Sequence, residues 1–547
     1  MEHLYDKLIQ YAQGEDYPLH MPGHKRRLFG QMPPQAYAMD VTEIDGFDDL
    51  HAPEGILQDL QERAAKLYGA RESFLLVGGS TAGILSAVFT ALPEGGHLLM
   101  VRNCHKSAYH AAYLRNLKIT YLMPPILAEF GICDGITPQQ VKEALKADPS
   151  IQAVLLVSPT YEGRISPIRE IAEVVHSYGK ILIVDEAHGA HLGLVKRQGF
   201  DKGWAGEDLA EENQTEKSRA GEWTEVPNSC QAGADLVIHS VHKTLPAMTQ
   251  TALLHVNGQR VELERLRRFL RIFQSSSPSY VLMASIDNAL TLMEQDGEAL
   301  YERLWNEFSK LTEALGACRH FRFLTTDSLR KRTPMLGDDY GPTRRMSKYG
   351  DIFSPARQDV GKLVIHAGDS GLTGQQIYDI LRERYHLQLE MAAGEYCLAM
   401  FTVGDTPEGY QRLKEALLEM DQAVDDGPGK TDTDVQRPDL EKAGNCAGEG
   451  AVQEAGPGMP VALPLVAKSL REAWDAPWEE VSLDACVGRI SVEFVNLYPP
   501  GTPVAAPGEV FTAQIREDLK RFEKQGLRLR GVTRSGDDLT VRCLIME

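Results

Sequence analysis

The sequence predicts an α/β fold with a mixed, mostly parallel β-sheet, and three observations support this. Residues 151–157 are almost wholly apolar, as in a parallel strand buried on both faces. Residues 167–178 then place apolar side chains on one helical face, and Gly179 ends that helix. The next apolar run, 180–185, reads as another strand. This strand–helix–strand order favours a parallel sheet with right-handed crossovers.

The remaining elements follow from the same periodicities. Predicted helices cover residues 3–13, 56–68, 84–92 and 281–315, and predicted strands cover 73–77, 97–102, 236–238, 252–256, 363–366 and 399–403. We expect an N-terminal segment (1–55), a large domain (56–300), a small α+β domain (301–420), a disordered linker (421–458) and a C-terminal α+β domain (459–547). A polar, acidic insertion at about 201–227 interrupts the large domain.

Composition excludes several classes of function. Apolar residues make up 43% and charged residues 24% of the 547 residues, as in ordinary globular proteins. The net charge of −20 argues against nucleic acid and anionic membranes as partners. Eight scattered cysteines without a Cys-x-x-Cys pair favour free thiols. With neither a signal peptide nor a long apolar run in the sequence, we expect a cytoplasmic protein.

Lys243 lies between two apolar runs, 236–238 and 252–256. Burial there would lower the pKa of its amine, and a neutral amine can attack a carbonyl to form a Schiff base. Ser240 and His242 are placed to contact a nearby anion. On this stretch alone, a loop lysine that reaches water is an equally good interpretation.

Two further stretches favour the chemical interpretation. Asp185 ends a predicted parallel strand, where it would face the ligand crevice. Gly79, Ser80 and Thr81 follow strand 73–77 and open a helix, where free N–H groups and hydroxyls form an anion site. An acid, a lysine and a phosphate cup are what pyridoxal 5′-phosphate (PLP) needs: the acid keeps the pyridine nitrogen protonated and the lysine binds the aldehyde.

Several longer stretches resemble the ornithine/lysine/arginine decarboxylase family of fold-type I PLP-dependent enzymes. The matching stretches are Pro18-Leu-His-Met-Pro-Gly-His-Lys25, residues 40–55, Arg102-Asn-Cys-His-Lys-Ser107, Ser158-Pro-Thr-Tyr-Glu-Gly163, and residues 240–250 and 487–509. They spread over nearly the whole chain. The resemblance implies a fold-type I large domain, a small domain and a C-terminal decarboxylase domain.

The resemblance also implies roles for individual residues. His105 would stack on the pyridine ring, and His188 would lie beside the 3′-oxygen of PLP. Ser276 or Ser277 would reach the phosphate of a partner subunit, so we expect a homodimer or higher homo-oligomer. Candidates for the substrate route are His20, His24 and Lys25, and Asp49 is a weaker candidate for the distal cation of the substrate.

The expected reaction is decarboxylation of a basic amino acid, arginine to agmatine first, because the short form of this family includes arginine decarboxylases. Lysine and then ornithine are the alternatives, as is a PLP aminotransferase or lyase of the same fold. Residues 185–188 also spell a helicase DEAH box, but Gly429-Lys430-Thr431 lacks the leading glycine of a phosphate loop. His188 and His191 have no third ligand at metal-binding spacing, so no metal is expected. A further alternative is a non-enzymatic scaffold that only keeps the fold. Failure of the protein to bind PLP would favour this alternative.

Overall fold

The structure, a computed structural model, describes residues 17–19, 43, 48–194, 226–325, 357–425, 463–497, 502–524, 527–536 and 538–545. The predicted helix 3–13 lies outside these residues, as do nearly all of the predicted insertion (201–227) and linker (421–458).

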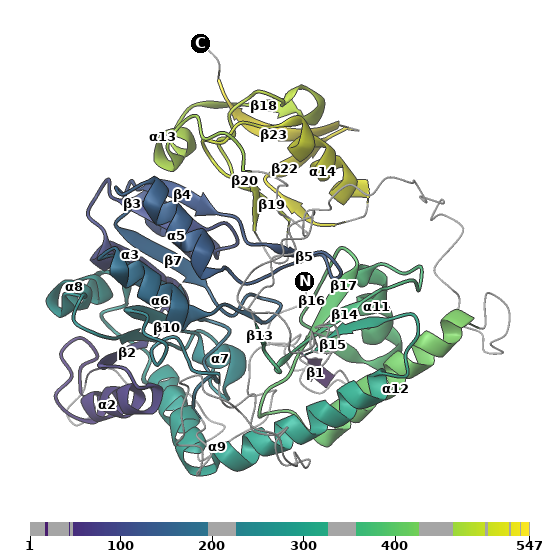
Figure 1. The fold of residues 1–547 in the computed structure, drawn as a ribbon, viewed down its shortest axis with the longest axis horizontal. Helices are drawn as coiled ribbons and strands as arrows, with labels where there is room; N and C mark the ends of the chain where they lie inside the picture. Colours follow the sequence, from purple (N-terminus) through teal and green to yellow (C-terminus); the bar gives the residue numbers. More distant parts are fainter. Residues whose placement is uncertain are drawn as a thin grey trace, which may run out of the picture.

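A seven-stranded sheet lies within residues 56–300, the predicted large domain (Figure 1). Its strand order is β2 (Glu72–Leu76), β11 (Ala252–Val256), β10 (Leu236–His239), β9 (Ile181–Asp185), β7 (Ala153–Val157), β3 (His97–Val101) and β4 (Lys118–Leu122). All strands run parallel except β11, which is antiparallel to both neighbours. The predicted mixed, mostly parallel sheet is therefore confirmed.

Helices cover both faces of this sheet because both faces are apolar. One core contains side chains from α3 (Gly79–Ala91), α4 (Lys106–Leu114), α5 (Pro138–Ala147), α6 (Ile168–Ser177) and α8 (Leu263–Phe273). A second core contains side chains from α2 (Ile56–Tyr68) and α9 (Tyr280–Leu315). Helix α2 has the predicted bounds and ends at Gly69, whose φ of 69° is left-handed.

A four-stranded antiparallel sheet lies within residues 301–420, the predicted small domain. Its order is β12 (Arg322–Leu324), β14 (Lys362–His366), β17 (Tyr396–Met400) and β16 (Met391–Ala393). Helices α11 (Gly374–Tyr385) and α12 (Pro407–Asp425) accompany it, and α12 packs along the long helix α9 (Figure 1). Short pairs join β1 (Tyr17–Leu19) to β15 (Leu387–Leu389), β8 (Arg164–Ile165) to β13 (Arg357–Gln358), and β5 (Ile126–Leu127) to β6 (Ile132–Cys133).

The C-terminal region has a core of its own and docks on the large domain (Figure 1). It contains two three-stranded sheets, β18 (Trp478–Ser482), β23 (Asp538–Leu544) and β22 (Val532–Ser535), then β20 (Pro503–Ala505), β19 (Val495–Leu497) and β21 (Leu529–Arg530), with helices α13 (Leu470–Trp474) and α14 (Ala513–Lys524). Trp474 packs edge-to-face on Tyr113 of α4 at 5.0 Å. None of the helices in the described residues is long and apolar enough to cross a membrane.

Candidate active site

The carboxyl ends of the parallel strands bring the predicted site residues to one edge of the large sheet. Strand β2 leads into Gly79 and β3 leads into His105. Strand β9 ends at Asp185, and its neighbour β10 leads into Ser240 and Lys243. Residues far apart in the sequence therefore meet at the edge where open α/β sheets bind ligands.

Lys243 lies in the single turn α7 (Val241–Thr244), directly after β10. Its Nζ is 3.1 Å from Nε2 of His188. Burial lowers the pKa of the amine, while the charges of Asp185 and Glu390 act in the opposite direction. The net lowering increases the fraction of neutral amine, which is the nucleophilic form.

Asp185 is 5% exposed at the end of β9, where it pairs in register with Ile238 of β10. Burial raises the pKa of its carboxyl, and the charge of Lys243 opposes that shift. The charge of Lys243 acts on the pKa of Asp185, and the charge of Asp185 acts on the pKa of Lys243. The two groups therefore belong to one site. A buried carboxyl of this kind is suited to binding a protonated ring nitrogen.

His188 is held beside Lys243 as a neutral ring. Burial lowers its pKa well below the ordinary value, and the charges of Lys243 and Lys362 add to that shift. The ring of Tyr161 covers it at 4.6 Å. Its Nδ1 has no hydrogen-bond partner among the described residues, so it remains available to a ligand oxygen.

His105 is the N-cap of α4, and its ring orientation is set locally. Its Nδ1 accepts the backbone N–H of Ser107 at 3.3 Å and lies 2.8 Å from the Ser107 hydroxyl. Burial and then the charge of Lys243 lower its pKa to about 4, so the ring is neutral at pH 7. The residue nevertheless remains accessible to solvent. A neutral ring with a fixed orientation is suited to stacking on a flat ligand.

The N-terminus of α3 fits a phosphate group. Gly79 has a φ of 71°, a left-handed conformation that favours glycine. No side chain of the described residues caps this 13-residue helix, so its first N–H groups, including those of Ser80 and Thr81, can bind an anion. Within the described ranges, the buried hydroxyl of Ser240 also lacks a partner. Together with Lys243 and Asp185, these groups fit PLP.

Other predicted site residues are less directly placed. Nδ1 of His242 bonds the carbonyl of Thr251 at 2.8 Å. Ser276 and Ser277 are exposed in the loop before α9, so a role toward a partner subunit remains a prediction. Asp49 accepts the backbone N–H of His51 at 2.8 Å in the turn before α2. Further residues proposed for the substrate route, His20, His24 and Lys25, lie outside the described residues.

The sequence analysis missed Glu390, which follows β15 in the small domain. Its charge acts on Lys243, and its Oε1 accepts the Tyr161 hydroxyl at 2.5 Å. Lys362 of β14 was also missed; it is 1% exposed, and its charge reaches His188. Neither residue belongs to a motif near Lys243 in the sequence, so no local signal identified them.

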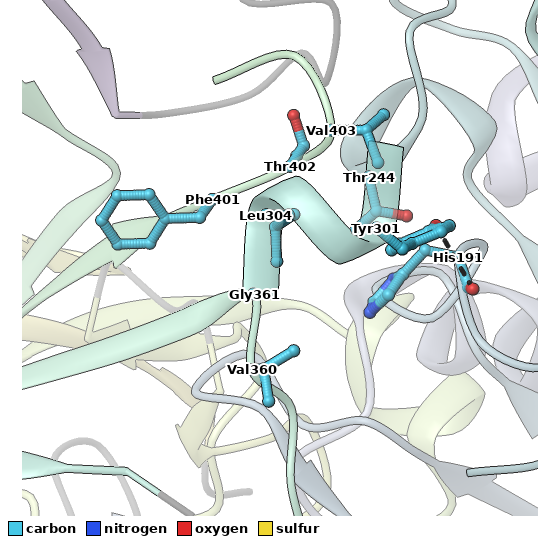
Figure 2. A pocket seen from close by; sticks show the side chains of 9 residues that line it. All are labelled: His191, Thr244, Tyr301, Leu304, Val360, Gly361, Phe401, Thr402 and Val403. Atoms are coloured by element: carbon cyan, nitrogen blue, oxygen red, sulfur yellow. Dashed lines mark hydrogen bonds between the residues drawn. The ribbon is translucent and has the colours of Figure 1, made fainter. Parts of the chain in front are cut away.

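A small cavity lies next to α7, the turn that contains Lys243 and is called the lysine turn below (Figure 2). Thr244, His191 and Tyr301 line it, and the Tyr301 hydroxyl donates to the His191 carbonyl at 3.4 Å. Its volume of about 10 Å³ is room for one water molecule, so it cannot hold a cofactor. Among the described residues, no three His, Cys, Asp or Glu side chains are grouped so that they could hold a metal ion. The ring of His191 bonds Asp359 at 3.0 Å.

Comparisons with known proteins agree on the family. The model described as "Orn/Lys/Arg decarboxylase, major domain" matches residues 2–215 and 222–408, and that of the C-terminal domain matches 457–533. An arginine decarboxylase of Bacillus anthracis is 28% identical over 551 residues, covering 99% of this chain and 96% of its own. Lysine decarboxylase LdcA of Pseudomonas aeruginosa is 26% identical over 575 residues, covering 94% and 75%.

Solved structures show the same fold. The crystal structure of the Francisella novicida lysine decarboxylase LdcF matches with a TM-score of 0.71 and 17% identity, covering 98% of this chain and 80% of that one. The fold is therefore that of fold-type I PLP-dependent enzymes, as predicted.

Proposed function

The chain belongs to the Orn/Lys/Arg decarboxylase family, and on that premise we propose that it decarboxylates arginine to agmatine and CO2 with PLP as cofactor. The family makes the protein a carboxy-lyase and implies a basic amino acid as substrate and PLP as cofactor. Arginine is favoured because relatives at about 28% identity that match along almost their whole length are arginine decarboxylases. The lysine decarboxylase from Pseudomonas matches over only 75% of its length.

The observation that carries the proposal is the pair formed by Lys243 and the buried Asp185 at the ends of adjacent strands. Lys243 would hold the aldehyde carbon of PLP, Asp185 its ring nitrogen, and the N-terminus of α3 with Ser240 its phosphate. When bound, PLP supplies an electron sink for the pair left on Cα after CO2 departs. Asp185 supports that sink by holding a positive charge on the ring nitrogen.

The protein side chains then control water and protons. His105 would cover one face of the ring and exclude water from it. His188 Nε2 lies 3.1 Å from Lys243 Nζ, and this hydrogen bond fixes the position of the amine. Lys243 Nζ would be the group that delivers a proton to Cα of the substrate, and His242 is the alternative donor. His188 would contact the 3′-oxygen of the ring through the Nδ1 that is unpartnered among the described residues.

Glu390 is the best candidate for the distal cation of the substrate. It lies close enough to Lys243 for its charge to act on the amine. The Tyr161 hydroxyl holds one carboxylate oxygen at 2.5 Å, which fixes the orientation of the group. A carboxylate can bind the guanidinium of arginine with two parallel hydrogen bonds, whereas a lysine ammonium offers a single point charge. Asp49, the candidate from the sequence, is the alternative residue for this cation.

The assembly proposed is a homodimer or higher homo-oligomer in the cytoplasm. Ser276 and Ser277 are exposed before α9, where a second copy could bring them to the phosphate. Light scattering on the purified protein should give at least twice the mass of one chain. A strictly monomeric, fully active enzyme would contradict this part of the proposal. The division into large, small and C-terminal domains is likewise proposed.

The decisive experiment incubates purified protein and PLP with arginine, lysine and ornithine separately and identifies the amine formed. We expect agmatine and CO2 from arginine, with much lower kcat/KM for the others. Glu390→Gln should raise KM for arginine more than it lowers kcat, and Glu415→Gln, at an exposed position of α12, is a control for the loss of one charge. Cadaverine or putrescine as the main product would replace arginine with lysine or ornithine. A keto acid without CO2 would indicate an aminotransferase.

A further inference from the structure

A continuous line of four buried polar side chains crosses the large sheet beside the candidate site. Ser73 Oγ is 2.6 Å from His255 Nδ1, and His255 Nε2 is 3.0 Å from His239 Nδ1. His239 Nε2 is in turn 2.7 Å from Glu186 Oε2. We call these four side chains the Ser73–Glu186 relay. It joins strands β2, β11 and β10 to the residue that follows β9.

The relay is sealed from water. His239 and His255 are both 0% exposed, and Glu186 is 1% exposed. Tyr68 of α2 lies against both rings, at centroid distances of 4.7 and 4.6 Å. Bulk water cannot replace a lost hydrogen-bond partner in this buried position. Each ring nitrogen must therefore match its neighbour, a donor facing an acceptor, so the tautomer of one ring sets that of the next.

The direction of the hydrogen bonds is set at Glu186 Oε2. The backbone N–H of Ser229 donates to this oxygen at 2.9 Å, and an Oε2 that carries no proton also accepts from His239 Nε2. Both rings are neutral, because burial lowers the pKa of His239 to about 3 and that of His255 well below its ordinary value. In a neutral ring the other nitrogen accepts. His239 Nδ1 therefore accepts from His255 Nε2, and His255 Nδ1 accepts from the Ser73 hydroxyl.

A proton on Glu186 has two places to sit. Burial raises the pKa of Glu186 to about 8, with the Ser229 hydrogen bonds acting in the opposite direction. The Ser229 N–H bound at Oε2 favours a proton on Oε1, which is 2.8 Å from the Ser229 hydroxyl, and Oε2 then still accepts from His239. A proton on Oε2 would instead donate to His239 Nε2 and reverse the tautomers of both rings. Glutamine reproduces the neutral arrangement with the proton on Oε1, with its carbonyl oxygen in place of Oε2 and its amide donating to Ser229. Glu186→Gln is therefore a conservative variant, and Glu186→Ala is a disruptive one.

We propose that Glu186, His239 and His255 are positioning residues that hold the two strand ends carrying Asp185 and Lys243. Glu186 directly follows Asp185, and His239 directly precedes Ser240 at the start of the lysine turn. The hydrogen bond between the Glu186 and His239 side chains joins the ends of β9 and β10 on the sheet face opposite α3. The backbone bond from Glu186 N to Ile238 O, 3.0 Å long, joins the same two ends. This inference rests on the proposed roles of Asp185 and Lys243.

The first test is made on the apoprotein and needs no cofactor. In ¹⁵N-histidine-labelled protein, with signals assigned by His239→Gln and His255→Gln, both rings should carry their proton on Nε2 and none on Nδ1. Glu186→Gln should keep both tautomers. A proton on Nδ1 of either ring in the unaltered protein would overturn the direction of the relay, whatever the protein catalyses.

The second test measures PLP affinity and the visible absorbance of the lysine-bound cofactor. Glu186→Ala should weaken PLP binding roughly 10- to 100-fold, the range seen when a group orienting a ligand-binding residue is lost, and Glu186→Gln should restore it to within about twofold. The matched control is His97→Ala. His97 is also buried and bonds the hydroxyls of Ser150 and Thr120 at 2.8 Å each, but it lies at the opposite end of the sheet strands. It should lower the melting temperature without changing PLP affinity.

The outcomes separate this inference from the proposed function. If the unaltered protein binds no PLP, the proposed function fails, while the tautomers still report on the relay. If it binds PLP and Glu186→Ala binds equally well, or if His97→Ala weakens binding as much as Glu186→Ala, the relay has only a structural role and the inference is overturned. Failure of Glu186→Gln to rescue binding in a folded protein would also overturn it.

Discussion

Replacing Glu509 with alanine should weaken the docking of the C-terminal region on the large domain. The two regions are joined by a bidentate ion pair in which Arg102 Nη1 and Nη2 donate to Glu509 at 2.5 and 2.9 Å. Both side chains are almost fully buried, at 0% and 2% exposed. In the variant Arg102 keeps the Pro503 carbonyl at 3.2 Å and the ring of Tyr121 at 4.8 Å, but loses its counter-charge.

The size of the effect follows from this burial. Removing one partner of a buried ion pair leaves an uncompensated charge and costs about 3–5 kcal/mol, roughly two to three and a half powers of ten in the equilibrium constant. The Ala506 N–H also loses its acceptor, Glu509 Oε2, at 2.8 Å. The double variant Arg102→Met/Glu509→Met removes both charges and should recover most of the lost free energy.

The assay is urea-induced unfolding, followed by tryptophan fluorescence, since Trp474 lies at this interface 5.0 Å from Tyr113. The matched control is Glu94→Ala, which breaks the exposed ion pair between Arg471 and Glu94, 3.8 Å long, across the same interface. It should leave the unfolding midpoint unchanged, because exposed pairs contribute little. A cost for Glu509→Ala below about 1 kcal/mol, or no recovery in the double variant, would refute this reasoning.

Three further predictions concern the site. Lys243→Ala should abolish turnover and the absorbance of lysine-bound PLP; retention of that band would remove Lys243 from its role. Asp185→Asn should retain PLP but lower kcat by roughly two to three powers of ten, the loss typical of one preorganised electrostatic contact, and a near-normal kcat would contradict it. Burial opposes ionisation of Asp359, but His191 and Lys362 outweigh it and lower its pKa. Ionised Asp359 therefore stabilises the fold above about pH 4, and this contribution is lost as pH falls through the folded pKa. Asp359→Asn should reduce the free energy of unfolding at pH 7 but hardly at pH 3, whereas a pH-independent loss would contradict the ion pair.

The sequence predicted the elements whose signal is local. Strand 180–185 and helix 56–68 were identified from apolar periodicity and terminal glycines, and both occur with nearly those bounds. Lys243 and Asp185 were recognised because parallel strands deliver their final residues to one edge. Their shared environment, seen in the opposed pKa shifts, is what that topology requires.

The remaining features depend on contacts between distant segments. Glu390 reaches the site from the small domain, and its partner Tyr161 is 229 residues away in the sequence. The Arg102–Glu509 pair spans 407 residues. Glu186 and His239 lie next to residues that the sequence analysis identified, Asp185 and Ser240. Their own role becomes visible only when the register of β9 and β10 brings the two side chains together. No periodicity encodes such pairings.

The most direct test of the central claim is to reduce the PLP-loaded protein with borohydride and map the modified lysine by peptide mass spectrometry. The phosphopyridoxyl group should be found on Lys243, and the Lys243→Ala protein should carry none. Its attachment to Lys362, the buried lysine whose charge also acts on His188, or to no lysine at all, would contradict the proposed active site.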